Sequence, residues 1–481
     1  MKIFDKTQGI SEESPKLNDP PAKAVNPITH GVIWKQLLLY FAPLLASSCL
    51  QLLYNTADTI IVGRFVGKIA LTAVGGSAGQ IYAMVTEFVI GASGGACVIL
   101  SQAYGARNRK ILDDGLHNAA ALALVMGGLF TAAGIALAGT ALRAAGAPAE
   151  TMAGSILYLR IAFAGLIPNA LYNMGAGVLR AVGDAKRPLR FLMISSGLNI
   201  VLDLIFVAVL RMGIGGAALA TVMTQTLSAA LVLRTLMRTG GRDLLMPGLD
   251  LRSLRLQKNV ALKMLRLGIP LGMETLMYTF SCVVLTSAVN TFGTDTVAAY
   301  AGFVRIESFY WMLEQAFAVS ITTFVGQNIG AGFGDRVRSV SRQGAVLMYI
   351  FMGAAIVIMY TGCPVWLGLF TTDPEVLRIG VSMMRFLLPF YILYIPNGVF
   401  FSTLRGLGDS LRPTLITFFG VCVLRILWVL AVFPRFPSIE ALLTCFPVSW
   451  SVTAVTYALY YRWFIKRNAL SGAAQSITNN Q

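Results

Sequence analysis

Polar side chains recur at helical spacing inside apolar segments of this chain. In SSGLNIVLDLIFVAVL, residues 195–210, Asn199 and Asp203 are four residues apart. On a helix they share one face, which Ser195 extends by a turn. In a membrane-spanning helix a charged side chain costs about 2.5–3.5 kcal/mol, and such residues usually face a cavity or a partner. The segment therefore predicts a polar, carboxylate-containing site that faces inward.

Three other apolar segments carry polar stripes that match this one. Because helix bundles bury such faces inward, we expect a single oxygen-rich cavity that contains the carboxylates of Asp58 and Asp203. The three stripes are Gln51, Tyr54, Asn55 and Asp58; Tyr158, Asn169 and Asn173; and Thr221, Gln225 and Ser228.

Two kinds of chemistry suit this set of groups. Two carboxylates in one pocket of low dielectric constant cannot both ionise cheaply, so the pair can take up and release a proton near neutral pH. Carboxylate, amide and hydroxyl oxygens also suit a small hard cation such as Na⁺. Hydrogen bonding between helices alone is the alternative, above all for the serines and threonines.

The composition places these segments in a membrane. Hydrophobic residues make up 56% of the 481 residues and charged residues only 12%, whereas a soluble domain has roughly 25% charged residues. The net charge of +16 comes from short basic clusters between apolar runs, which are typical of orientation signals rather than of nucleic-acid binding. With no nucleotide loop, no triad and only two histidines, we expect no enzyme, no cofactor and no nucleic-acid partner.

Twelve segments are apolar enough over the roughly 20 residues that a bilayer-spanning helix needs. Basic clusters occupy alternate loops, so the positive-inside rule predicts that both termini are cytoplasmic. The predicted spans are 33–61, 70–100, 116–141, 152–179, 188–210, 214–238, 260–291, 296–326, 340–362, 376–403, 411–434 and 440–464.

The chain also repeats itself at an offset of 225 residues. LRAVGDAKRP at 179–188 returns as LRGLGDSLRP at 404–413, and SQAYGA at 101–106 returns as GQNIGA at 326–331. The repeat predicts an all-α protein of two six-helix bundles related by a parallel pseudo-two-fold axis. We interpret LR-x-x-GD itself as a turn followed by a helix start. The expected divisions are a cytosolic tail at 1–32, a first lobe at 33–238, a cytoplasmic linker at 239–259, a second lobe at 260–466 and a cytosolic tail at 467–481.

The polar pattern differs between the two halves. At the offset of 225, Asn199 and Asp203 correspond to Leu424 and Trp428, so the acidic stripe has no counterpart. The second half instead carries Glu274 in its first span. We interpret four further in-span charges as partners in ion pairs inside the bundles: Glu87, Arg160, Arg305 and Arg425.

Over nearly its whole length the chain resembles the multidrug and toxic compound extrusion (MATE) transporters of bacterial type. The resemblance is carried by NTADTIIVGRFVG, by LRAVGDAKRP followed by GLNIVLD, by GIGGAALAT and by VGQNIGAG. It implies a multi-pass protein of the bacterial inner membrane. It further implies an antiporter in which H⁺ or Na⁺ enters while an amphipathic, often cationic drug leaves by alternating access.

The resemblance also assigns roles to residues. The cation or proton site of one branch corresponds to Asp58, Asn199, Asp203 and Thr221, which is also where Na⁺, the only metal we expect, would bind. A supporting network corresponds to Pro43, Tyr54 and Tyr158, where the proline permits a bend in its helix. Glu274 matches an acid of another branch, whose second carboxylate is missing here, with Tyr394 near its place. The candidate substrate contacts are Gln51, Asn55, Asn173, Glu274 and Tyr394.

Other functions remain as alternatives. A lipid-linked oligosaccharide flippase of the related fold group would have more basic residues around its cavity, whereas an acidic, polar cavity favours cationic cargo. A channel or a structural membrane protein fits less well, because the two halves have unequal polar interiors. We expect a monomer whose partners are drug-like small molecules and the lipid bilayer.

Overall fold

The computed structural model describes residues 26–67, 74, 76–239 and 245–468. Within this part all regular structure is helical, which confirms the predicted all-α class. Among these described residues, ten helices are long and apolar enough to cross a membrane, and a pair bent by 44° makes an eleventh. The twelfth span is α11 (Thr294–Gly330), a helix of 37 residues whose apolar run is interrupted by Arg305, Glu307 and Glu314.

The first lobe, as we use the term, is the group of helices from α2 to α9. A four-residue helix, α1 (Pro27–His30), precedes it. Its members are α2 (Ile33–Phe65), α4 (Ser77–Gly105), α5 (Arg109–Ala144), α6 (Ala149–Ala164), α7 (Leu166–Ala181), α8 (Lys186–Asp203), the π-helical turn η1 (Leu204–Val209) and α9 (Gly213–Thr239).

The second lobe is the group from α10 to α19. Its members are α10 (Lys258–Val289), η2 (Asn290–Phe292), α11, α12 (Gly334–Thr361), α13 (Cys363–Gly368), α14 (Pro374–Leu387), η3 (Leu388–Tyr394), α15 (Ile395–Gly406), α16 (Leu411–Thr417), η4 (Phe418–Val423), α17 (Leu424–Ala431), α18 (Ile439–Leu443) and α19 (Cys445–Asn468). The tails and the linker predicted from the sequence fall in part on 1–25, 240–244 and 469–481, and the start of the predicted second span falls on 70–73 and 75, all outside the described residues.

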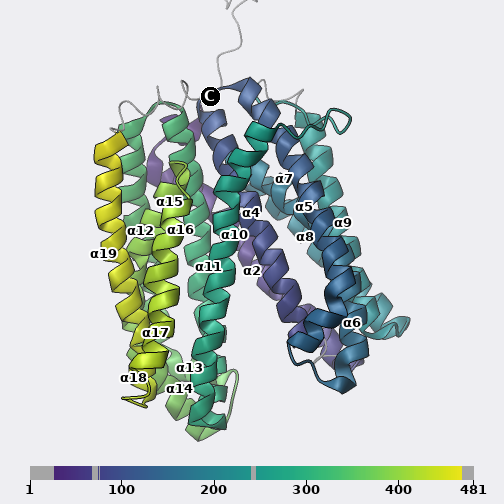
Figure 1. The fold of residues 1–481 in the computed structure, drawn as a ribbon, viewed down its shortest axis with the longest axis vertical. Helices are drawn as coiled ribbons and strands as arrows, with labels where there is room; N and C mark the ends of the chain where they lie inside the picture. The colour runs from purple at the N-terminus through teal and green to yellow at the C-terminus, as the bar shows by residue number, and fades with distance from the viewer. Residues whose placement is uncertain (1–25, 68–73, 75, 240–244, 469–481) are drawn as a thin grey trace, which may run out of the picture.

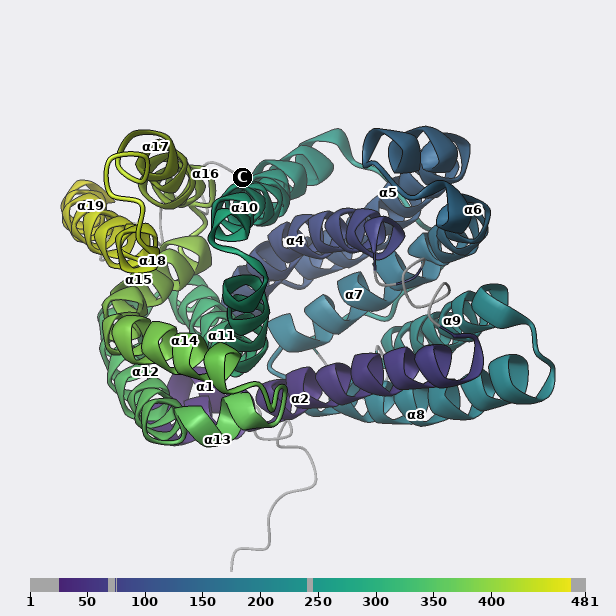
Figure 2. The ribbon, with the colours of Figure 1, turned by 90° about the horizontal axis from the view of Figure 1, so that it is seen from below.

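The two lobes approach each other at one end of the molecule and diverge toward the other (Figure 1). The near end carries the loops after α4, α7, α11 and α15, and it is the upper end in Figure 1. Seen along the helices, α2 runs beside α8 at one side of the first lobe and continues toward the second lobe (Figure 2).

Two helices belong to the packing of both lobes. Leu37 and Phe41 of α2 lie in the core of the second lobe, whereas Ile61 and Val62, further along the same helix, pack against Val207 of η1. In the same way, α10 packs on α4 of the first lobe and on α16 and α17 of the second. The lobes are therefore joined by two long helices as well as by the linker between them.

Glycines allow α4 and α10 to touch through their backbones. A Cβ atom at Gly91 would lie 2.7 Å from Cα of Gly272, and one at Gly268 would lie 2.1 Å from the carbonyl oxygen of Ala92. Small residues permit such close contact between membrane helices, where dispersion forces rather than hydrophobic burial hold helices together.

A second contact between the lobes is formed by equivalent residues of the internal repeat. Nε2 of Gln102 on α4 donates a hydrogen bond to the carbonyl oxygen of Gly406 (2.9 Å), and Nε2 of Gln327 on α11 donates to that of Ala181 (2.6 Å). Gln327 and Gly406 are the repeat equivalents of Gln102 and Ala181, each 225 residues further on. We call these two hydrogen bonds the reciprocal contact; they join the lobes at the ends of α7 and α15.

The described part of the linker is held on α5. The guanidinium of Arg255 bonds the carboxylates of Asp113 and Asp114, at 2.6 and 2.7 Å. Nε2 of His117 accepts the backbone N–H of Asp250 (3.1 Å). A hydrogen bond from the Ser253 hydroxyl lowers the pKa of Asp250, which therefore stays ionised well below neutral pH.

Candidate functional site

The end of α8 carries a buried polar pair. Asn199 and Asp203 are 1% and 0% exposed, and Asp203 is the last residue before the π-helical turn η1. Such turns are rare and often lie at functional sites. One turn further back, the hydroxyl of Ser195 accepts a hydrogen bond from Ser228 of α9 (2.5 Å), which ties the two helices together.

Asp58 of α2 is a neighbour of Asp203, and the two carboxylates interact electrostatically. Tyr54 is one helical turn before Asp58 and lies near Thr221, and Tyr158 of α6 is within electrostatic range of Asp58. The structure therefore brings together side chains from α2, α6, α8 and α9. We call this set the acidic cluster: Tyr54, Asp58, Tyr158, Asn199, Asp203 and Thr221.

The acidic cluster contains buried polar atoms that have no hydrogen-bond partner among the described residues. They are Oδ1 of Asp58, both carboxylate oxygens of Asp203, and Oδ1 and Nδ2 of Asn199. Leaving a buried polar group unsatisfied costs about 1–3 kcal/mol, and more when it is charged. A proton shared between the carboxylates, or a small cation held by these oxygens, would remove that cost.

A second site is a cavity of about 310 Å³ between the lobes. Its walls come mainly from α4, α7, α10, α11 and α15, and include Asn173, Glu274 and Tyr394. The central cavity, as we call it, is also lined by charged residues that the sequence analysis did not assign to a site: Glu87, Glu314, Arg180 and Arg405.

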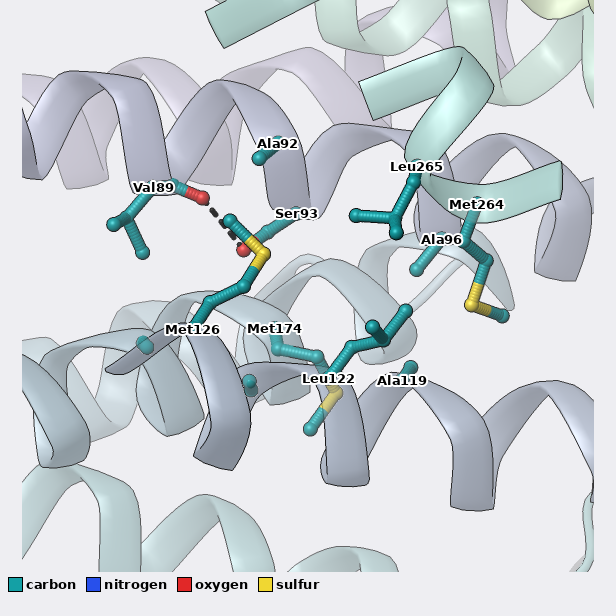
Figure 3. A pocket seen from close by; sticks show the side chains of 12 residues that line it. Val89, Ala92, Ser93, Ala96, Ala119, Leu122, Met126, Met174, Met264 and Leu265 are labelled. Carbon is teal, nitrogen blue, oxygen red and sulfur yellow. Dashed lines mark hydrogen bonds between the residues drawn. The ribbon is translucent and has the colours of Figure 1, made fainter. Parts of the chain in front are cut away.

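A third cavity does not qualify as a site. It measures about 20 Å³ and lies among α4, α5, α7 and α10, with Met126, Met174 and Met264 around it (Figure 3). The hydroxyl of Ser93, its one polar lining side chain, already donates to the carbonyl oxygen of Val89 (2.8 Å). The space has room for about one water molecule but offers it no free polar partner.

The family model named MatE matches this chain twice, over residues 43–205 and 270–430. The chain belongs to the MatE family. The two matched segments fall in the first and second lobes, in agreement with the internal repeat, and the resemblance inferred from the sequence is confirmed.

The similarity of this MatE chain to known proteins extends over most of its length. It is 28% identical to "Probable multidrug resistance protein YoeA" of Bacillus subtilis, with 92% of this chain and 96% of that protein covered. It is 27% identical to "Probable multidrug resistance protein NorM" of Thermotoga maritima, with 82% and 84% covered. A structure described as the outward-facing conformation of a multidrug resistance MATE family transporter superimposes with a TM-score of 0.84, at 24% identity, and covers 92% of this chain and 98% of that one. This likeness confirms the predicted twelve-helix fold.

Within this MatE fold, not all the predicted site residues come together. The proposed cation residues and both tyrosines of the supporting network are in the acidic cluster, but Pro43 is fifteen residues before Asp58 on α2, about 22 Å along the helix. The helix continues through Pro43 without a break.

The candidate substrate contacts divide between two places. Asn173, Glu274 and Tyr394 line the central cavity. Gln51 and Asn55 lie on an exposed face of α2, away from the lining of that cavity.

The interpretation of the in-span charges as ion pairs is wrong for the described residues. None of Glu87, Arg160, Arg305 and Arg425 has an oppositely charged atom within 4.0 Å there. Arg425 is 1% exposed, and its guanidinium stacks over the ring of Phe446 at 4.3 Å while Nε donates to the Ser449 hydroxyl. Aromatic rings can stabilise a buried arginine in place of a carboxylate.

Arg180 and Arg405 are not predicted as site residues from the sequence, because they belong to the LR-x-x-GD repeat, which is typical of a turn. Gly183 and Gly408 do adopt positive φ angles of 95° and 92°, as a turn there requires. The arginine itself could have indicated a site, because both copies of the repeat keep it. In the structure each arginine is in the last turn of a helix that borders the other lobe.

Proposed function

We propose that this MatE protein is an antiporter that exports amphipathic, often cationic compounds by alternating access, driven by H⁺ or Na⁺. The observation that carries the proposal is the acidic cluster, with two neighbouring carboxylates and unsatisfied polar atoms inside one lobe. Two relatives are named as probable multidrug resistance proteins, which supports a drug-like cargo.

In this mechanism the acidic cluster holds the coupling ion. A proton, or Na⁺ held by oxygens of Asp58, Asn199, Asp203 and Thr221, would reduce the repulsion between the two carboxylates. Release of that ion to the other side of the membrane would leave them charged again. Since α2 carries Asp58 and also packs in the second lobe, a change at the cluster is transmitted to the packing between the lobes.

The proposed orientation follows from charge. Basic residues lie at the near end, in the loops after α4, α7, α11 and α15 or in the first turn of the helix that follows each loop; examples are Arg107, Lys186, Arg336 and Arg412. The positive-inside rule then makes this end cytoplasmic, together with both chain termini. The conformation described here would be closed toward the cytoplasm.

Ethidium efflux from intact cells tests the proposal. Efflux is measured with Na⁺ present or absent, and with the proton gradient intact or collapsed. Loss of efflux on collapse of the proton gradient, irrespective of Na⁺, identifies a proton relay, and efflux that follows a Na⁺ gradient identifies Na⁺ ligands. Absence of energised efflux despite good membrane expression would contradict the proposal and favour the flippase.

A further inference from the structure

We propose that a basic groove on the second lobe binds an anionic phospholipid, with the phosphate at the near end of the molecule and the acyl chains along α15. The groove has a volume of about 790 Å³ and lies between α12 and α19, while α15 packs on both helices and forms its floor. These three helices are on the side of the second lobe that is turned away from the first lobe (Figure 2). The groove shares no lining residue with the central cavity, so the inference does not depend on the proposed export function.

Four basic side chains line one end of the groove. Arg338 and Arg342 are four residues apart near the start of α12, and Arg462 and Lys466 are four residues apart near the end of α19. The two members of each pair therefore share one face of their helix. The start of α12 and the end of α19 both lie at the near end (Figure 1). None of the described residues that line the groove is acidic.

The protein leaves most of this positive charge without a counterion. Within the described part of the chain, no carboxylate oxygen lies within 4.0 Å of Arg342, Arg462 or Lys466. Arg338 has Asp335 at 4.0 Å, but that carboxylate is fully exposed and water screens such a pair. Arginine binds phosphate through two parallel hydrogen bonds, and basic pockets between membrane helices near the membrane surface bind anionic lipid headgroups.

The floor of the groove becomes apolar with distance from the near end. The hydroxyl of Thr403, in the last turn of α15, is already hydrogen-bonded to the Ser341 hydroxyl (2.9 Å) and to the carbonyl oxygen of Val399 (2.7 Å). Below it the floor continues with Val399, Phe400 and Pro396. Pro396 is seven residues before Thr403, which is about 10.5 Å along the helix. A basic end above an apolar channel matches a lipid with an anionic headgroup and acyl chains.

The linker covers the equivalent surface of the first lobe. Five residues of the groove have equivalents, 225 residues earlier, that belong to one buried hydrophobic cluster with Met246 and Leu249 of the linker. The five pairs are Ser341 and Leu116, Ala345 and Ala120, Val399 and Met174, Thr403 and Val178, and Tyr461 and Leu236. The fold therefore fills this place in the first lobe with its own chain, and the described part of the second lobe leaves it open.

The charge of the two places differs as well. In the first lobe the equivalents of the two arginines of α12 are Asp113 and His117, which accept hydrogen bonds from Arg255 and from the backbone of Asp250 in the linker. The arginines of the second lobe are donors only, so they require an anion instead. Residues 469–481 include no aspartate or glutamate, whereas the surrounding membrane offers phosphate groups.

Palmitoyl-oleoyl phosphatidylglycerol and the phosphatidylethanolamine with the same acyl chains form a matched pair of probes. Native mass spectrometry of the full-length protein gives the Kd of each lipid, and we expect phosphatidylglycerol to bind more tightly. Arg342→Gln/Lys466→Gln should raise the phosphatidylglycerol Kd by roughly tenfold or more. The control Arg109→Gln/Lys110→Gln removes the same two charges from exposed positions at the start of α5 and should leave that Kd within about twofold of the wild type.

A second variant fills the groove without removing a charge. Ala345 is in the wall that α12 contributes, and we expect Ala345→Trp to raise the phosphatidylglycerol Kd because the indole occupies the space of the acyl chains. Val346→Trp is the matched control, since Val346 is the next residue along α12, is exposed and does not line the groove. It should leave the Kd unchanged.

Four outcomes would overturn the inference. Equal Kd values for the two lipids in the wild type would show that the phosphate charge is not recognised. An equal effect of the two double variants would indicate general attraction to a basic surface. Binding of phosphatidylglycerol only after removal of residues 469–481 would assign the groove to that segment. A dimer in the mass spectrum that Ala345→Trp dissociates would assign it to a second copy of the chain.

Discussion

At the scale of residues, the two carboxylates of the acidic cluster are not equivalent. Asp203 is fully buried, whereas Asp58 is only partly buried, and both oxygens of Asp203 lack a hydrogen-bond partner among the described residues. An ionised Asp203 therefore loses more solvation free energy than an ionised Asp58, so a bound proton or cation stabilises Asp203 more.

We expect Asp203→Asn to abolish energised ethidium efflux while the protein stays folded. The change removes a buried charge and keeps the shape of the side chain, so the thermal midpoint should stay the same or rise. Efflux and Tm are compared with those of Asp295→Asn, which changes a carboxylate at the exposed start of α11. Normal drug resistance in cells that express Asp203→Asn at wild-type levels would contradict the role of Asp203.

Glu274→Gln should have a milder effect on efflux, because Glu274 lines the central cavity and is outside the acidic cluster. We expect ethidium efflux to fall by less than tenfold and its ion dependence to stay the same. Complete loss of transport in Glu274→Gln, together with normal transport in Asp203→Asn, would move the coupling site to the second lobe.

Residue spacing was enough to predict most of the acidic cluster. Asp58, Asn199 and Asp203 stand out because polar groups at helical spacing are rare in apolar segments. Arg180 and Arg405 could not be found in this way, since each is a single basic residue near the end of a span. Only their recurrence at equivalent positions of the two halves marks them, and that recurrence does not show whether the side chain points to water or into a cavity between the lobes.

At the scale of elements, the breaks within spans have local causes. The fourth predicted span, 152–179, is bent by 44° at Gly165, between α6 and α7, three residues before Pro168. The tenth, 376–403, passes through the 3₁₀ segment η3 with Pro389 and Pro396 in and after it. Proline removes a backbone N–H from the helix and clashes with the preceding turn, so hydropathy finds these spans but does not show their bends.

The close packing of α4 and α10 predicts that a larger side chain at Gly268 lowers the stability of the protein. In Gly268→Ala the new methyl group would lie 2.1 Å from the carbonyl oxygen of Ala92, so the helices must separate. We expect a loss of about 1–3 kcal/mol in stability, measured as a lower Tm in detergent. Gly197→Ala on α8, where a Cβ atom meets nothing within 4 Å, is the control and should not lower Tm. Equal Tm values for the two variants would show that the α4–α10 contact is not tight.

At the scale of the whole molecule, the repeat predicted two bundles, but not the way in which they are joined. The contributions of α2 and α10 to both lobes depend on contacts between residues far apart in sequence, such as Phe41 with Phe317, whose rings stack at 4.0 Å. No local pattern encodes such pairs. The reciprocal contact is the exception, because its two halves are repeated in the sequence.

Removing the reciprocal contact should open the near end of the molecule. In the double variant Gln102→Ala/Gln327→Ala, two hydrogen bonds of about 1 kcal/mol each are lost from the closed form, which favours the open form roughly fivefold per bond. The measurement is the distance distribution between spin labels at Lys186 and Leu411, two exposed repeat-equivalent sites, in a background without the native cysteines. We expect a new population at longer distance. The exposed Gln80→Ala should leave the distribution as in the wild type, and an unchanged distribution in the double variant would contradict a gating role.

The reciprocal contact also bears on how such a chain could arise. A residue of the first copy bonds the second copy, and the equivalent residue of the second copy bonds the first in return. This is the pattern of an isologous interface between two identical subunits. A single gene encoding one six-helix unit with this glutamine and this carbonyl would already have formed a parallel dimer in the membrane. Duplication and fusion would then have freed each half to change, so that one kept the acidic stripe and the other acquired Glu274.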